Sequence, residues 1–109
     1  MLGRRTSTAF FTEMEMKQYV QFYVDECTKH MAALEKSLIK VESAMAVSRV
    51  DLENAELFVK GMPEEERHMG ESYVKECKRK FTSLQKRFDR EAIALRDYKL
   101  GLEQAKKHL

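Results

Sequence analysis

Apolar residues recur every three or four positions along most of this chain. In the first half they form a seam that no Gly or Pro interrupts before Gly61. Alternating steps of three and four are the heptad pattern of helices that pack along their length. The seam therefore predicts a helical arm over residues 12–61. Its members are Met16, Val20, Tyr23, Cys27, Met31, Leu34, Leu38, Val41, Met45, Ser48, Leu52, Ala55, Val59 and Met62.

A capping motif marks the start of this arm. Thr12 and Glu15 have the S/T-x-x-E spacing, in which each side chain bonds to the free backbone amide of the other residue. Phe11 and Met16 flank them at the positions of a hydrophobic staple. We therefore expect the helix to begin beside Thr12, and we expect residues 1–11 to form a flexible basic N-terminus.

The seam slips once, between Cys27 and Met31, where two four-residue steps meet. The slip is either a stutter in one helix or a break, with residues 28–30 as a connection between two helices. The absence of Gly and Pro favours a continuous helix, which would be roughly 75 Å long at about 1.5 Å per residue. The apolar cluster at residues 19–24 covers more than one stripe, which favours a separate helix. The sequence leaves both alternatives open.

The chain turns at Gly61-Met62-Pro63. Gly61 suits the left-handed residue that ends a helix, because glycine has no Cβ to clash. Pro63 suits the first position of the next helix, where its missing N–H costs nothing. Glutamates at residues 64–66 then lie where the helix dipole favours anions. We expect a turn at residues 61–63 and a second helical arm over residues 63–108.

The second arm carries its own apolar seam. From Phe81 to Leu102 the spacing approximates an eleven-residue rhythm. Gly70 is a weak point near the start, costing about 1 kcal/mol relative to Ala, and we expect Gly101 to fray the last turn. The seam comprises Met69, Tyr73, Cys77, Phe81, Leu84, Phe88, Ala92, Leu95, Leu102, Ala105 and Leu109.

Two arms joined by a tight turn pack antiparallel. Residues 12–109 are therefore predicted to form a single all-α domain. If the first arm breaks near residues 28–30, the domain is an antiparallel three-helix bundle, which is the primary prediction. If it does not break, the domain is a long two-helix antiparallel coiled-coil hairpin, whose remaining apolar surface needs a partner chain.

Composition and charge narrow the class of protein. The chain has 109 residues, of which 35% are charged, and its net charge of +2 predicts neither nucleic-acid nor membrane binding. Cys27 and Cys77 are too few for a disulfide framework or a zinc site, so we expect core residues in a reducing compartment. No apolar run of about 18 residues is present to span a membrane. The basic, acid-free first twelve residues resemble a mitochondrial presequence in composition.

No arrangement of residues indicates catalysis. The consecutive glutamates at 64–66 point about 100° apart on a helix and do not converge on one ion. His30, His68 and His108 have no ligand partners at motif spacing and are expected to be solvated. Phosphate loops and nucleophile motifs are absent from the sequence. We therefore predict no enzyme activity, no metal, no cofactor and no small-molecule substrate.

The second arm carries a run of cations that is a candidate basic face for a protein partner or an anion. Acidic residues are interspersed with it, and i,i+4 pairs such as Glu71 with Lys75 and Glu76 with Lys80 favour an ordinary solvated helix face. A nucleic-acid or anionic-lipid site here would bind less tightly as salt rises. The candidate residues are Lys75, Lys78, Arg79, Lys86, Arg87 and Arg90.

The sequence around the turn resembles a known family. LENAELFVKGMP at residues 52–63, followed by EEERHMGESYVKECKRKFTSLQKRFDR, is similar to the N-terminal domain of the Vti-type v-SNARE family. In that family a helix runs into a valine-basic-x-apolar-proline turn, and a long helix with an F-x-R ending follows. Val59, Lys60, Met62, Pro63, Arg67, Lys78, Leu84, Phe88 and Arg90 stand at matching positions without a gap.

The resemblance implies a three-helix N-terminal bundle with a role in vesicle-mediated transport. Its partners would be trafficking adaptors or other SNAREs, at the cytosolic face of Golgi or endosomal membranes. The family continues after residue 90 into a SNARE coiled-coil motif and a membrane anchor, and residues 91–109 contain neither.

Two functions of different classes follow. The primary prediction is a cytoplasmic interaction domain that binds trafficking adaptors. The alternative is a structural helical-hairpin subunit of a larger assembly, for example a mitochondrial complex. We also expect that the chain can associate with itself.

Overall fold

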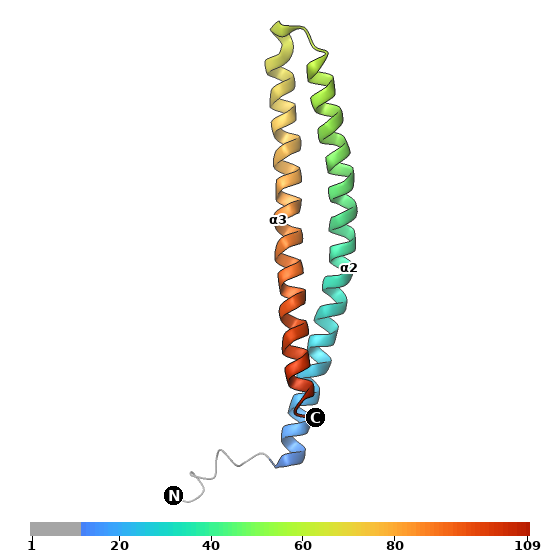
Figure 1. The fold of residues 1–109 in the computed structure, drawn as a ribbon, viewed down its shortest axis with the longest axis vertical. Helices are drawn as coiled ribbons and strands as arrows, with labels where there is room; N and C mark the ends of the chain where they lie inside the picture. The colour runs from blue at the N-terminus through green and yellow to red at the C-terminus, as the bar shows by residue number, and fades with distance from the viewer. Residues whose placement is uncertain (1–11) are drawn as a thin grey trace, which may run out of the picture. The chain divides into compact units, whose positions relative to one another are not determined.

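The computed structural model describes residues 12–109, and these residues are all-helical. Helix α2 runs over Glu13–Lys60, a 3-10 turn η2 over Glu64–Glu66, and helix α3 over Arg67–Lys106. Figure 1 shows the chain passing from α2 through the turn into α3. The predicted all-α class is therefore confirmed for this part of the chain. The predicted flexible terminus at residues 1–11, and with it the staple at Phe11, lies outside the described residues.

Helix α2 begins at a reciprocal pair of hydrogen bonds. The Glu15 amide donates to Thr12 Oγ1 at 3.1 Å, and the Thr12 amide donates to Glu15 Oε1 at 3.3 Å. The Met16 amide donates to the Thr12 carbonyl at 2.9 Å. These bonds satisfy amide groups that the first turn of a helix leaves without partners. The Thr-x-x-Glu spacing at residues 12–15 therefore correctly predicts where α2 begins.

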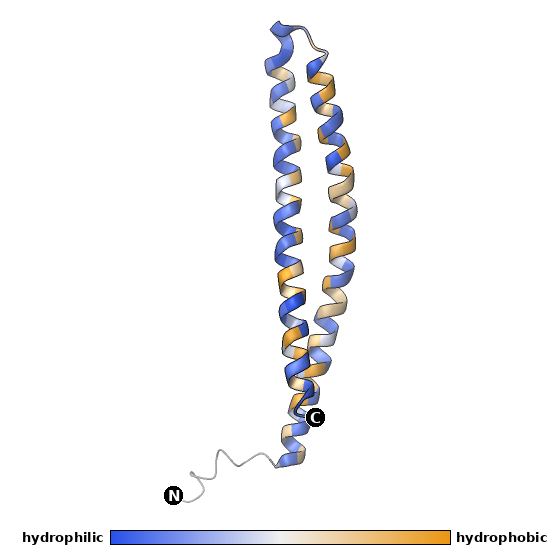
Figure 2. Ribbon diagram, in the orientation of Figure 1, coloured by the Kyte–Doolittle hydropathy of each residue, from blue (hydrophilic) through white to orange (hydrophobic). Residues whose placement is uncertain are grey.

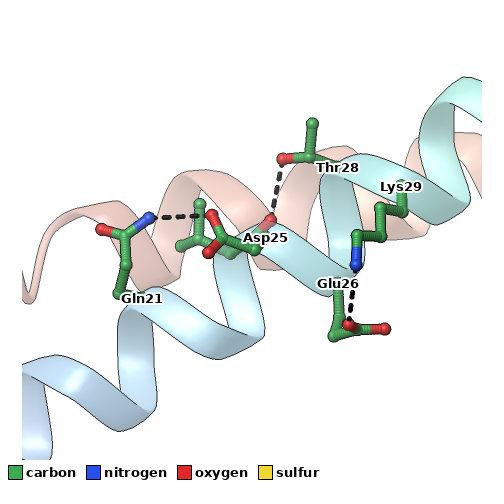
Figure 3. Close-up of polar contacts among 6 residues, drawn as sticks. Gln21, Asp25, Glu26, Thr28 and Lys29 are labelled. Carbon is green, nitrogen blue, oxygen red and sulfur yellow. Dashed lines mark hydrogen bonds and ion pairs between the residues drawn. The ribbon is translucent and has the colours of Figure 1, made fainter.

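Helix α2 does not break at residues 28–30. The Thr28 hydroxyl donates to the Val24 carbonyl at 2.7 Å, a bond that Thr makes within a continuing helix (Figure 3). Pairs on the same helix flank it, with the Gln21 amide 3.0 Å from Asp25 and the Lys29 ammonium 3.5 Å from Glu26. The three-helix bundle prediction is therefore wrong, because no second turn is formed. The hairpin alternative fits the two helices.

The apparent slip in the α2 seam disappears once burial is known. Val24 is 7% exposed, whereas its neighbour Tyr23 is 44% exposed, so Val24 takes the position assigned to Tyr23. The steps then alternate between four and three without interruption. This unbroken heptad explains why one helix accommodates the whole arm. The seam positions, all buried or half-buried, are Val20, Val24, Cys27, Met31, Leu34, Leu38, Val41, Met45, Ser48, Leu52, Ala55, Val59 and Met62.

The seam of α3 is a heptad as well, and the expected eleven-residue rhythm is not followed. Met69 and Tyr73 are 66% and 57% exposed, and their neighbours Gly70 and Val74 face inward instead. The inward positions alternate by four and three along the helix. They are Gly70, Val74, Cys77, Phe81, Leu84, Phe88, Glu91, Leu95, Tyr98, Leu102 and Ala105.

The hairpin divides into two units, which we describe separately. Unit 1 holds the described residues up to Ala33 together with Leu95–Leu109, and unit 2 holds Leu34–Ala94. In unit 1 the His30 and Tyr98 rings stack at 5.4 Å, so His30 is not simply solvated. A Cβ built on Gly101 would lie 2.8 Å from the Tyr23 hydroxyl. Gly101 therefore allows the Tyr23 side chain of α2 to approach α3 closely. Helix α3 continues to Lys106, so the expected fraying at Gly101 does not occur.

Unit 2 is packed around small residues. Val41, Ser48 and Ala55, at seven-residue intervals, are each no more than 3% exposed. Gly70 of α3 is buried, and an added Cβ would come within 2.6 Å of Val59 Cγ2 and 2.7 Å of the Met62 sulfur. The Arg49 guanidinium lies over the Phe81 ring at 5.6 Å. Small side chains in the interface allow the backbones of α2 and α3 to approach closely here.

The turn lies where the sequence places it but has a different conformation. Gly61 has no positive φ, so the expected left-handed cap is not formed. Instead its amide donates to the Leu57 and Phe58 carbonyls at 3.3 and 3.2 Å, and the Met62 amide donates to Val59 at 3.1 Å. Pro63 is extended, with ψ 146°, and precedes η2 instead of starting a long helix. The last turn of α2 thus tightens toward 3-10 geometry, which satisfies carbonyls without a left-handed residue.

Candidate protein-interaction surface

The side of α2 that faces away from α3 in unit 2 is apolar. Ile39, Leu57 and Phe58 are 66%, 66% and 68% exposed, and Val47 and Val50 are 62% and 53% exposed. At about 100° per residue these positions lie on the opposite side of the helix from the buried line. We call this surface the α2 outer face. It comprises Ile39, Ser43, Ala46, Val47, Val50, Asn54, Leu57 and Phe58.

Charged residues border the α2 outer face and interrupt it. Lys36 and Lys40 lie on the same helix lines as Val50 and Val47, and Glu53 lies on the line of Ile39 and Ala46. Glu35, Glu42, Arg49 and Asp51 lie at its sides. An apolar patch with a charged rim is the pattern of a protein interaction site.

The corresponding surface of α3 is polar. We call it the α3 outer surface, and it holds most of the predicted basic residues. Figure 2 shows the contrast, because α3 is mostly hydrophilic in this region while α2 carries many more apolar residues. The α3 outer surface comprises exposed residues only, namely Glu71, Lys75, Lys78, Arg79, Thr82, Ser83, Lys86, Asp89 and Arg90.

The structure brings four of the six predicted basic residues together on α3. Lys75, Lys78, Arg79 and Lys86 line a shallow surface together with two hydroxyl residues of α3. Arg79 forms an ion pair with Glu76, one turn away on the same helix. The expected Glu76–Lys80 partnership is thus replaced by an i,i+3 pair. These contacts are typical of a solvated helix face.

Arg87 turns toward α2 and joins a polar network. Its Nε lies 3.0 Å from Glu91 Oε2, and its Nη2 donates to Ser37 Oγ at 3.1 Å. The hydrogen bond from Ser37, assisted by Arg87 and the nearby charge of Arg90, lowers the pKa of the Glu91 carboxyl. A carboxylate held this way favours its charged form. Arg87 therefore connects the two helices of unit 2.

An open groove of about 820 Å³ lies beside the turn, between α2 and α3 of unit 2. Its walls mix charges, with Glu53 and Glu56 on α2 and Lys75 and Lys78 on α3. Leu57 also lines the groove and links it to the α2 outer face.

Two tyrosine–cysteine pairs occupy equivalent local settings. Tyr23 is followed by Cys27, and Tyr73 by Cys77, within the repeated sequence Tyr-Val-x-Glu-Cys. In each case a hydrogen bond with the cysteine raises the pKa of the tyrosine. Both cysteines are free thiols. No cluster of three or more potential metal ligands occurs in residues 12–109.

Comparison of the chain with protein-family models, with curated proteins and with solved structures found no match. Neither α2 nor α3 contains an apolar stretch long enough to cross a membrane.

The sequence predicted that a hairpin would leave apolar surface needing a partner chain, but it did not place that surface on the α2 outer face. A usable signal was present, because Ile39, Val50 and Leu57 occupy positions that face water in a two-helix hairpin.

Proposed function

We propose that this chain is a non-enzymatic structural subunit of a larger assembly, and that it docks through the α2 outer face. The observation that carries the proposal is the second apolar side of α2 in unit 2. A helix that is apolar on two sides is normally covered on both. In the hairpin, α3 covers only one of them.

Energetics support the same proposal. Fully burying a Val, Leu, Ile or Phe side chain is worth about 1.5–3 kcal/mol. The five large side chains of the α2 outer face are each more than half exposed, so much of this energy is still available. A partner helix placed along the face would recover several kcal/mol.

The hairpin favours a structural subunit over a SNARE-type adaptor-binding bundle. That bundle requires a third helix, and α2 supplies none because it is continuous from Glu13 to Lys60. The role in vesicle-mediated transport therefore stays a prediction that rests on the resemblance around Pro63.

The test is the size of the native assembly. The full chain, tagged and expressed in its own cells, should fractionate under native conditions in a species larger than the purified chain. Val50→Glu should release it from that species, because it places a carboxylate in the apolar centre. Ser83→Glu on the α3 outer surface makes the same charge change at an exposed position and should leave the species intact. A native species no larger than the purified chain would remove the proposal.

The same experiment locates the assembly. Fractionating cytosol and mitochondria separately distinguishes the two expected homes. Recovery of the large species from mitochondria would support the organellar assembly, and recovery with Golgi or endosomal membranes would support the trafficking context.

A further inference from the structure

We propose that a basic hollow on α3 is a binding site for a ligand that carries several phosphate groups. The hollow lies wholly within unit 2, on the exposed side of the helix. This inference is independent of the docking proposal for the α2 outer face. We call the residues that line the hollow the α3 anion site, and they are Lys75, Lys78, Arg79, Thr82, Ser83 and Lys86.

Helix periodicity brings the residues of the α3 anion site to one side of α3. At about 100° per residue, Lys75, Arg79 and Lys86 follow one line along the helix, and the other three residues lie on or beside that line. All six are exposed, and together they border a shallow hollow of about 470 Å³. Four positive charges therefore surround one small volume, and the residues that line it include no acid.

The cations of the site are largely unused inside the hairpin. Lys75, Lys78 and Lys86 form no ion pair within residues 12–109, and Arg79 pairs only with Glu76. Like charges held close together without counter-charges repel each other, and an anion placed among them removes that repulsion. The arrangement therefore favours a negatively charged ligand.

Two hydroxyl groups indicate which kind of anion fits. The hydroxyls of Thr28 and Ser72 donate to carbonyls of their own helix, but those of Thr82 and Ser83 form no such bond within the described residues. They are therefore available as donors beside the cations. A phosphate group carries up to two negative charges and three acceptor oxygens, so it can accept from cations and hydroxyls together.

The length of the site indicates more than one phosphate group. Lys75 and Lys86 are roughly 16 Å apart along the helix axis, at about 1.5 Å per residue. A single phosphate would reach both only if the two lysines folded toward each other, which costs side-chain entropy. Glu71 lies one turn before Lys75 and Asp89 one turn after Lys86, so acids mark both ends of the site. A compact ligand with several phosphates matches this interval.

Other anionic partners fit the site less well. Its lining residues include no aromatic ring on which the bases of a single-stranded nucleic acid could stack. They include no large apolar side chain either, so an acidic protein helix would bury little apolar surface there. Exposed ion pairs alone contribute little to a complex.

The first test is calorimetric titration of the purified full chain with sodium tripolyphosphate. We expect saturable binding that is roughly tenfold or more tighter than binding of inorganic phosphate, because several cations are engaged at once. The binding should weaken as salt rises, since the site is exposed. Absence of saturable binding, or equal affinity for the two probes, would overturn this inference.

Matched variants then test the position of the site. Lys78→Gln with Lys86→Gln should weaken tripolyphosphate binding roughly tenfold or more. Lys36→Gln with Lys40→Gln removes the same charge from α2 and should change the affinity by less than about twofold at physiological salt. Circular dichroism checks that both variants stay helical. Equal weakening in the two would assign binding to net charge and overturn the site.

A further pair of variants separates this inference from the docking proposal. Ser83→Glu places a carboxylate in the α3 anion site and should weaken tripolyphosphate binding roughly tenfold or more. Val50→Glu, which is expected to release the native assembly, should leave that binding unchanged. Unchanged binding by the Ser83→Glu variant would overturn the site, whatever the size of the native assembly.

Vesicles distinguish a lipid headgroup from a soluble ligand. The chain is sedimented with phosphatidylcholine vesicles that contain either phosphatidylinositol bisphosphate or phosphatidylserine at equal total charge. Binding to the first alone, lost in Lys78→Gln with Lys86→Gln, would identify the headgroup as the source of the phosphates. Binding to tripolyphosphate without binding to either vesicle would identify a soluble ligand. Equal binding to both vesicles would overturn the preference for phosphate groups.

Discussion

The α2 outer face and the α3 outer surface belong to the same two-helix unit but are built differently. Each lies on the side of its helix that the other helix does not cover. On α3 that side is charged, so the helix has one apolar side and one solvated side. On α2 both sides are apolar, and the residues at its uncovered side include Ile39, Val50 and Leu57. The contrast is the reason that we propose docking through α2 and not through α3.

The inner and outer sides of α2 also differ in exposure. On the inner side Val41, Ser48 and Ala55 are fully buried, and larger residues such as Leu52 are half-buried between them. On the outer face Leu57 and Phe58 are each about two-thirds exposed. Substitutions on the two sides should have different consequences.

The largest effect is expected from a charge placed on the inner side. Val41 is 2% exposed, so Val41→Glu should bury an unpaired carboxylate and cost about 3–5 kcal/mol, enough to unfold a small domain. Val50→Glu on the outer face should keep its helical signal in dilute solution. Thermal unfolding followed by circular dichroism measures both variants. Equal losses of helix in dilute samples would mean that the two sides of α2 are not distinct.

A smaller effect separates the two glycines near the turn. Gly70→Ala should lower the free energy of unfolding by about 1–3 kcal/mol, because its Cβ would press on Val59 and Met62. Gly61→Ala meets only backbone oxygens at 3.8 Å or more and needs no positive φ, so it should be neutral or gain about 0.4–1 kcal/mol. Denaturant titration compares the two. A stabilising Gly70→Ala would show that α3 does not approach α2 this closely.

The polar network of unit 2 should give a pH-dependent effect below about 1 kcal/mol. The folded pKa of Glu91 is lowered, so its contribution is present above the unfolded pKa and is lost as pH falls through the folded pKa. Glu91→Gln should therefore be less stable than the parent chain at pH 7, and the two should converge in acid. Denaturant midpoints between pH 7 and pH 2 measure the difference. A gap that persists at the lowest pH would assign the effect to packing instead of charge.

The smallest effect is expected on the α3 outer surface. Lys78→Gln with Lys86→Gln removes two exposed cations that form no ion pair within residues 12–109. Their combined effect on stability should stay within about 0.5 kcal/mol. Thermal melts at low and high salt provide the check. A larger loss of stability would show that the charged side of α3 also carries a contact.

Much of the fold follows from the sequence because helix periodicity and breakers are local signals. The long arms, the capping pair at Thr12 and Glu15, and the turn between Gly61 and Pro63 are all visible in the residue pattern. The conformation of the turn is not, because Gly61 permits a left-handed cap without requiring one. A glycine permits more backbone conformations than other residues, and the surrounding hydrogen bonds select one of them.

The register of the seams could not be read correctly from hydrophobicity alone. Tyr23 and Val24 are adjacent apolar residues, as are Tyr73 and Val74. Choosing the larger residue of each pair assigns the tyrosines to the seam. Close helix packing selects the smaller residue, as it does with Gly70 in place of Met69. The predicted slip at residues 28–30 arose from this choice. Continuity of the helix depends on which residue is buried, and burial is a property of the packed pair.

The site was predicted less well than the fold. The basic residues of α3 were visible as a run, but Arg87 lies in a cross-helix network that only the packed structure reveals. The α2 outer face was hidden because an apolar residue in a helical pattern is first assigned to the core. The two apolar sides of α2 can be distinguished only when the structure shows which of them α3 covers.

The incomplete burial inside unit 2 has a consequence for the lifetime of the chain in the cell. Val41, Ser48 and Ala55 are fully buried, but larger inward side chains such as Leu52 and Phe81 are only half-buried, so a hairpin without its partner should open often. Proteases act on the opened population. Copies that have not found a partner should therefore be degraded first, and the amount of this protein should follow the amount of its assembly.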